Sequence, residues 1–97
     1  MALVVRSTPV GSKLNQLEIF DGQMLIGEYE RAQGADIERK KKEVQNAAAL
    51  LLDVFRRHGP FVVRWDRLSR TKSIRVNGVE VGVIPRIHWE TPSWKGP

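Results

Sequence analysis

The sequence contains no cysteine, which excludes disulfides, thiolate metal sites and a cysteine nucleophile and fits a reducing compartment. It also has no apolar run near the ~20 residues that a membrane-spanning helix requires. Met1 is followed by ALVV and then Arg6, a start that lacks the basic segment and the long apolar core of a signal peptide. We therefore expect an intracellular, cytoplasmic protein without a membrane partner.

Histidine is scarce as well, and its placement does not indicate catalysis. Neither His58 nor His88 has a second ligand at a metal-binding spacing, and no glycine-rich phosphate loop is present. His58 falls in the last turn of a predicted helix, where a positive charge complements the helix dipole. We predict no catalytic residues, no metal and no cofactor, and hence a protein that is not an enzyme.

One carboxylate pair offers an alternative to this conclusion. Glu28 and Glu30 share one face of a predicted strand, and Asp21 stands seven residues before Glu28, an arrangement that suggests a metal-dependent nuclease. Glu30 is followed by Arg31, however, and a suitably placed lysine is missing. Solvent-facing acidic side chains are the commoner explanation, so we favour a structural role.

The length of 97 residues, with 41% hydrophobic and 28% charged residues, suits one domain with one core. We place this domain at residues 1–88. Residues 89–97 contain Trp89, Trp94 and two prolines without a clear period, and we predict that they form a C-terminal tail.

Residues 36–58 have the pattern of one long helix. Apolar residues recur at spacings of three and four: Val44, Ala47, Ala48, Leu51, Val54 and Phe55. Asp36 suits the N-cap, and Gly59 with Pro60 suits the end of the helix. Such a helix would be ~34 Å long, so we expect its lysine-bearing start to overhang the sheet.

The apolar arc of this helix is wide enough to need further cover. With Ile37 and Leu52 it spans roughly 160°, more than the ~100° that packs on one sheet, and Leu50 lies outside even that arc. We expect either a homodimer, through this flank or a sheet edge, or a cover formed by the tail.

Strand patterns flank the helix on both sides. We predict strands at residues 2–6, 17–20 and 23–29, with a hairpin turn at Asp21-Gly22, and at 61–65, 73–76 and 79–84, with a turn at Asn77-Gly78. Phe61, Val63 and Trp65 alternate along one strand and should face the core. The expected fold class is α+β, a single long helix packed on a mainly antiparallel sheet, in the order βββ-α-βββ.

Positive charge is concentrated in the second half of the chain. Residues 1–48 hold seven basic and seven acidic residues, so the net charge of +5 lies within residues 49–97. The segment RWDRLSRTKSIR carries five cations around one acid, Asp66. Arginine predominates there, and its planar fork suits phosphate groups. Such a basic surface indicates an anionic partner, although many small domains are basic for solubility alone.

We therefore predict a small non-enzymatic module that binds nucleic acid, either DNA or RNA, through a basic strand-loop-strand. The predicted contact residues are Arg64, Arg67, Arg70, Lys72 and Arg75, with Lys40, Lys41 and Lys42 as a second contact and Trp94 as a stacking residue. The alternative is a protein-binding module, an inhibitor or adaptor, that engages an acidic protein surface or pairs through an edge strand.

The helix assignment predicts a clear order of mutational effects. Leu51→Ala and Phe55→Ala should each lower the free energy of unfolding by ~2–5 kcal/mol, because each removes a large apolar side chain from the core. Lys42→Ala should change it by less than ~0.5 kcal/mol. Chemical denaturation of the three variants measures these differences, and a neutral Leu51→Ala would show that the helix face is misassigned.

Overall fold

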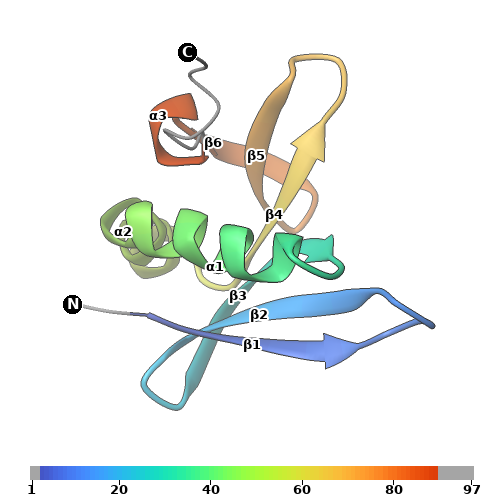
Figure 1. Ribbon diagram of the computed structural model, residues 1–97. Coiled ribbons are helices and arrows are strands. Elements are labelled where there is room, and N and C mark those ends of the chain that lie inside the picture. Colours follow the sequence, from blue (N-terminus) through green and yellow to red (C-terminus); the bar gives the residue numbers. More distant parts are fainter. Residues whose placement is uncertain (1–2, 90–97) are drawn as a thin grey trace.

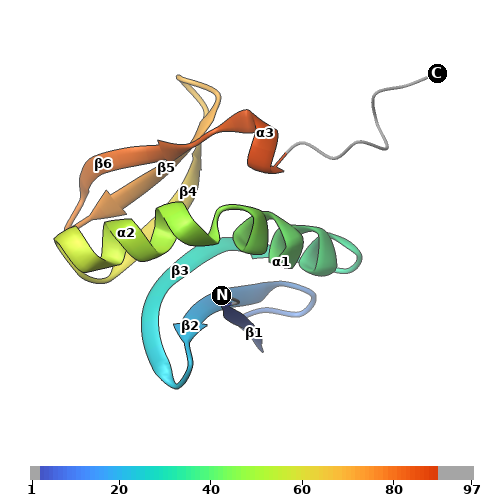
Figure 2. The same ribbon diagram turned by 90° about the vertical axis from the view of Figure 1, so that its left-hand side faces the viewer.

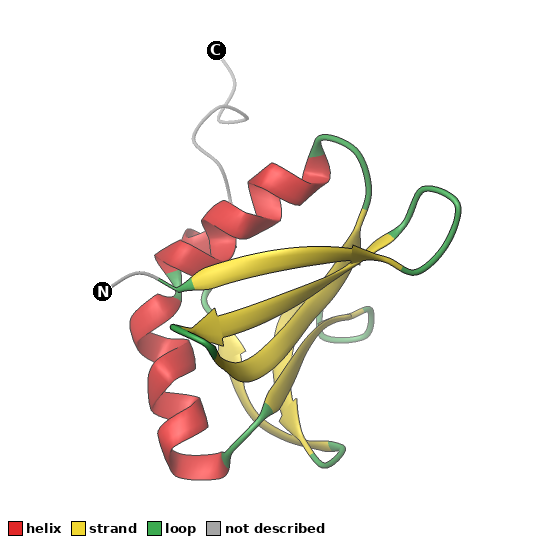
Figure 3. Ribbon diagram, turned by 90° about the horizontal axis from the view of Figure 1, so that it is seen from below, coloured by secondary structure: helices red, strands yellow, loops and turns green. Residues whose placement is uncertain are grey.

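The computed structural model describes residues 3–89, in which six strands form one sheet with helices on one of its faces (Figures 1 and 3). The strands are β1 (Val4–Pro9), β2 (Asn15–Asp21), β3 (Met24–Ala32), β4 (Phe61–Asp66), β5 (Thr71–Val76) and β6 (Val79–Ile84). The helices are α1 (Asp36–Asn46), α2 (Ala48–His58) and α3 (Arg86–Trp89). The predicted α+β class and the two groups of three strands are confirmed.

The strands lie in the order β1-β2-β3-β4-β5-β6, and all neighbours are antiparallel except β3 and β4. These two are parallel because α1 and α2 carry the chain back between them. Their pairing consists of Gly27 with Phe61 and Glu28 with Val62. The sheet therefore consists of two three-stranded meanders, and it curves around the helices, as Figure 2 shows.

The prediction of a single long helix is wrong, because the helix breaks at Ala47. This residue has φ −101° and ψ 12°, and its N–H donates to the carbonyls of both Glu43 and Val44, at 3.0 and 3.1 Å. Helices α1 and α2 run at a clear angle (Figure 3). Helix α1 packs on β1, β2 and β3, whereas α2 packs on β3, β4 and β6. The bend thus lets each part of the helical segment follow one half of the curved sheet.

One predicted helix end is confirmed and the other is corrected. Gly59 has φ 87°, and its N–H donates to the Phe55 carbonyl at 2.8 Å, as expected of a residue that ends a helix. Asp36, in contrast, is the first helical residue and not the cap. Ala35 occupies the cap position without a side-chain hydrogen bond, and Asp36 instead forms an ion pair with Arg39 at 3.1 Å.

The two predicted hairpins also differ in outcome. Asn77 and Gly78 both have positive φ, 53° and 81°, between the paired Val76 and Val79, which confirms this turn. In the first hairpin Asp21 pairs with Met24, so the turn is Gly22-Gln23, one residue later than predicted. Gly22 takes the positive φ of 64°, and a turn of the II′ kind needs that conformation only at its first position.

The core lies between the helices and the concave face of the sheet. Its fully buried side chains include Leu17, Ile19, Ile26, Tyr29, Val44, Leu51, Phe61, Val63, Ile74 and Ile84. Leu50 is half-buried and packs against this core, so the chain itself covers part of the wide apolar arc. Phe55 is also only half-buried, and its truncation should therefore cost less than that of Leu51.

The parallel junction of the two meanders depends on a glycine. Gly27 is buried, and a Cβ atom at this position would lie 2.5 Å from the ring of Phe61. Phe61 is the Cα partner of Gly27 in the register and is almost fully buried. Only a residue without a side chain therefore lets β3 approach β4 at this point.

We predict that Gly27→Ala lowers the free energy of unfolding by ~1–3 kcal/mol, because the added methyl group collides with a ring that the core holds in place. Urea denaturation measures the loss. Gly82→Ala is the matched control, since a Cβ there would make an ordinary contact of 3.8 Å with Ile74. Phe61→Leu should remove part of the penalty in the Gly27→Ala background, whereas full additivity of the two changes would contradict the steric explanation.

Candidate functional site

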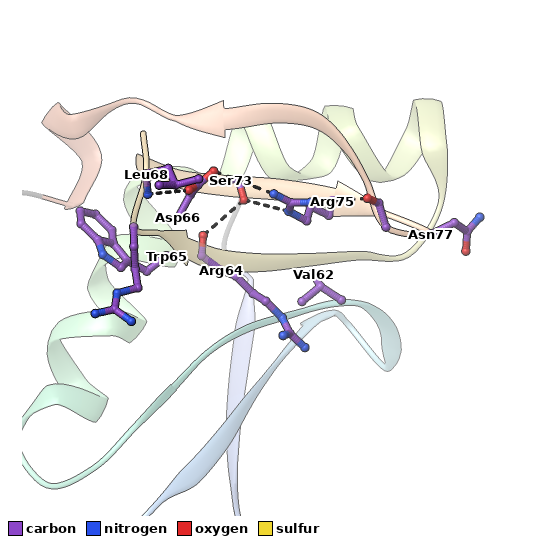
Figure 4. Close-up of a pocket in the computed structure, with 10 residues that line it drawn as sticks. Val62, Arg64, Trp65, Asp66, Leu68, Ser73, Arg75 and Asn77 are labelled. Carbon is purple, nitrogen blue, oxygen red and sulfur yellow. Dashed lines mark hydrogen bonds and ion pairs between the residues drawn. The ribbon is translucent and has the colours of Figure 1, made fainter. Parts of the chain in front are cut away.

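A groove of about 580 Å³ lies on the face of β4 and β5 that turns away from the helices (Figure 4). Phe61, Val63 and Ile74 face the core, so their neighbours Arg64 and Arg75 point to the opposite side. The lining residues are Val62, Arg64, Trp65, Asp66, Arg67, Leu68, Ser73, Arg75, Asn77 and Gly78. The groove thus follows β4 and β5 from the loop between them to the β5–β6 turn.

The three arginines of the groove differ in whether their guanidinium groups contact other residues. Arg75 donates to Ser73 Oγ at 3.3 Å and to the Gly78 carbonyl at 3.5 Å, and its Nη2 lies 3.9 Å from an Asp66 oxygen. The guanidinium groups of Arg64 and Arg67 form no ion pair or hydrogen bond with any residue in the range 3–89. Arg64 also lines a second groove, between β3 and β4, together with Glu28 and Arg31.

Asp66 organises the β4–β5 loop. One carboxylate oxygen accepts the N–H groups of Leu68 and Ser69 at 3.0 and 3.4 Å, and the Asp66 carbonyl accepts the Arg70 N–H at 2.8 Å. The hydrogen bonds from Ser69 and Leu68 lower the pKa of Asp66 below its ordinary value. Arg70 takes a positive φ of 57°, which closes the loop. The sequence analysis missed this role of Asp66. The signal for it is an Asp that precedes a short polar segment between two strands, because such a side chain can accept hydrogen bonds from the next backbone N–H groups.

Trp65 corrects one expectation, because its side chain is 43% exposed and not part of the core. Trp65 stays on the same face as the buried Phe61 and Val63, because its partner in the register is the inward-pointing Lys72, but the core ends before it. Helix α3 covers this end of the sheet instead. Its Trp89 lies edge to face with Trp65, with ring centres 5.7 Å apart and planes at 86°, and donates its indole N–H to the Ile84 carbonyl at 3.1 Å.

Lys72 does not join the groove, because it points into the protein. Its side chain is 6% exposed, and its Nζ lies 2.7 Å from Glu43 Oε1 and 3.1 Å from Glu30 Oε2. Tyr29 donates its hydroxyl to the same Glu43 oxygen at 2.7 Å. Burial, followed by the charge of Glu43, raises the pKa of Tyr29, so the hydroxyl remains a donor. The lysine charge is therefore matched inside the protein.

The lysines of α1 lie on the helical side of the sheet, away from the groove. Lys40 contacts Glu30 at 3.0 Å and donates to the Arg31 carbonyl at 2.8 Å, and Lys41 lies 3.4 Å from Glu38. Lys42 is exposed. The structure thus brings together Arg64, Arg67 and Arg75 with Arg70 in the adjoining loop, and it separates Lys40, Lys41, Lys42 and Lys72 from them. Trp94 lies outside the described residues.

The carboxylates considered for a nuclease do not form a metal site in the described part of the chain. Glu30 forms ion pairs with Lys40 and Lys72. Among residues 3–89, no three His, Asp or Glu side chains lie close enough together to bind a metal ion. In the same range, no helix combines the length and the apolar character needed to cross a membrane.

Comparisons with models of protein families, with curated protein sequences and with solved structures each found no match.

The buried contacts of Lys72 predict that its loss destabilises the fold. Lys72→Met should lower the free energy of unfolding by ~3–5 kcal/mol, because it leaves the Glu43 carboxylate buried without its ammonium partner. Thermal or chemical denaturation measures the loss. Arg67→Ala is the control, and this exposed residue should change stability by less than ~0.5 kcal/mol.

A second substitution tests the cause of this loss. Glu43→Gln keeps an acceptor for the Tyr29 hydroxyl but removes the stranded charge, so it should recover much of the stability in the Lys72→Met background. A double variant that is as unstable as the sum of both changes would show that charge pairing is not the reason.

Proposed function

We propose that the protein binds nucleic acid through phosphate contacts on the helix-free face of β4 and β5. The observation that supports this proposal is that Arg64 and Arg67 line one groove and that neither guanidinium group has a partner within residues 3–89. Guanidinium groups form bidentate hydrogen bonds with phosphate oxygens. An arginine that has no carboxylate partner among the described residues 3–89 offers these donors to a ligand.

The electrostatics of the groove favour an anionic ligand. Arg64, Arg67 and Arg75 contribute three positive charges, and Arg70 adds a fourth in the loop. Asp66 is the one acidic residue in the lining, and its carboxylate already accepts hydrogen bonds from loop amides. A concave surface with an excess of one charge concentrates counter-ions of the opposite sign.

The groove is also partly preorganised. The bonds to Ser73 and Gly78 fix the guanidinium group of Arg75, and Asp66 fixes the loop that carries Arg67 and Arg70. A ligand that binds such groups orders fewer side chains, so less conformational entropy is lost on binding.

The second candidate is a protein-binding module that uses the same basic surface against an acidic partner. The side chain of Leu68, at the tip of the β4–β5 loop, supports it because it is 98% exposed. An exposed leucine beside arginines suits the centre of a protein interface. The strands β1 and β6 are the edges of the sheet, and self-association through one of them would yield the proposed homodimer.

Salt dependence tests the phosphate contacts. A site that neutralises about four phosphates should lose affinity with a log-log salt slope near −3 to −4. The double variant Arg64→Ala/Arg67→Ala should flatten this slope by about one to two units, since each arginine replaces counter-ions on one phosphate. Titration of labelled single- and double-stranded DNA and RNA at several salt concentrations gives the slopes.

The matched control is Arg56→Ala/Arg57→Ala, which removes the same net charge from exposed positions on α2. Its slope should stay close to that of the parent protein. Equal effects of the two double variants would indicate attraction by net charge alone. Absence of binding to every oligonucleotide at low salt would reject the proposal and favour an acidic protein partner.

A further inference from the structure

The loop between β4 and β5 presents an apolar side chain to solvent. Its residues, Arg67 to Arg70, are all exposed, and the loop projects from the end of the two strands (Figures 1 and 2). Leu68 is the most exposed of the large hydrophobic side chains within residues 3–89, at 98%. A single exposed leucine is common on protein surfaces. Two further features of this loop, its fixed backbone and its cations, indicate that this one meets a ligand.

The backbone of the loop is fixed by short hydrogen bonds. The Asp66 carboxylate accepts the N–H groups of Leu68 at 3.0 Å and Ser69 at 3.4 Å, and the Asp66 carbonyl accepts the Arg70 N–H at 2.8 Å. The hydroxyl groups of Ser69 and Thr71 lie 2.7 Å apart. The leucine is therefore held at a defined position at the tip, and a ligand that covers it orders little of the loop.

The cations around Leu68 define the chemistry of its ligand. The side chains of Arg64, Arg67 and Arg70 are exposed, and their guanidinium groups form no ion pair or hydrogen bond with any residue in the range 3–89. Two of these arginines flank Leu68 within the loop itself. A ligand that suits the loop has anionic groups at its surface and an apolar layer directly behind them. A nucleic-acid duplex has this construction, with phosphates outside and stacked bases inside.

We propose that the β4–β5 loop enters the minor groove of a DNA duplex, where Leu68 wedges between two base pairs while Arg67 and Arg70 contact the flanking phosphates. This inference rests on the proposed phosphate contacts and specifies the form of the nucleic acid. An aliphatic wedge in the minor groove partly unstacks one base step and kinks the duplex by ~20–90°. Unpaired bases of a single strand are instead held by aromatic planes, which a leucine does not offer.

The positions of the arginines favour a duplex over an anionic membrane, the other surface with an apolar layer behind phosphates. Arg75 lies four residues from the start of β5 at Thr71, which is ~13 Å along the strand. A membrane touched by the loop tip would leave Arg75 beyond the Debye length of ~8 Å. A phosphate strand that borders the minor groove can instead continue from the loop along the groove on β4 and β5.

The test measures whether Leu68 unstacks the duplex. Two labelled duplexes of the same sequence are compared, one intact and one with a short bulge of unpaired bases at its centre, where no stacking has to be broken. Leu68→Ala removes the wedge, and Leu68→Met keeps an aliphatic side chain of similar length. Val10→Ala is the matched control, since Val10 is an exposed apolar residue in the β1–β2 loop of the other meander.

We expect the parent protein to bind the bulged duplex more tightly than the intact one by about 10- to 100-fold, because the bulge removes the cost of unstacking. For Leu68→Ala the two affinities should agree to within about threefold, since nothing is inserted. Leu68→Met and Val10→Ala should keep the preference of the parent. The salt slope should be the same in all four proteins, because no phosphate contact is altered.

Energy transfer between dyes at the two ends of the intact duplex gives an independent readout. The parent protein should bring the ends closer together, because it kinks the duplex, and Leu68→Ala should not. Thermal melting of the variants should match that of the parent, since Leu68 is not part of the core.

Three results would overturn the inference while leaving the phosphate contacts in place. They are equal affinity of the parent for the two duplexes without a change in end-to-end distance, an unchanged preference in Leu68→Ala, and tighter binding of the single strand than of either duplex. Binding to vesicles of anionic lipid that requires Leu68, together with equal affinity for the two duplexes, would assign the loop to a membrane. Failure of the proposed function itself looks different, because then the parent protein binds no oligonucleotide at low salt.

Discussion

The close approach of β3 and β4 at Gly27 is the constraint on which the rest of the structure depends. Two residue pairs join the meanders there, and the ring of Phe61 fills the space that any side chain at position 27 would need. The helical crossover then has to return the chain in parallel to β3 while it covers both halves of a curved sheet. A straight helix cannot follow that curvature, and the break at Ala47 allows α1 and α2 to pack on different meanders.

A second connection between the two halves of the sheet is electrostatic, and it determines which basic side chains are buried. Lys72 of β5 reaches Glu43 of α1 and Glu30 of β3, so three elements distant in sequence meet at one ammonium group. The contacts satisfy charges that would be costly to bury alone. Lys40 of α1 also forms an ion pair with Glu30. Among residues 3–89, the guanidinium groups of Arg64 and Arg67, which line the groove on the outer side of β4 and β5, have no such partners.

The outer surface is largely built from local interactions. Asp66 binds the amides of its own loop, and Arg75 is held by Ser73 and by the following turn. On the helix side of the same strand, in contrast, Trp65 contacts a distant element, because α3 supplies Trp89 as its neighbour. The outer side of this hairpin thus combines a fixed guanidinium group, that of Arg75, with the exposed Leu68 at the tip of its loop.

The sequence by itself determined the features that depend on neighbouring residues. Asn77 and Gly78 tolerate positive φ wherever they stand, Gly59 ends a helix for the same reason, and the alternation of Phe61 and Val63 places them on one face. Only the tertiary structure decided whether similar residues became buried and ion-paired or stayed exposed. Lys72 and Arg67 belong to one basic segment, yet the first is buried against carboxylates from α1 and β3 and the second is exposed. Trp65 continues the pattern of Phe61 and Val63 but lies where the core has ended. Burial and ion pairing depend on which distant elements pack nearby, and local periodicity carries no information about that.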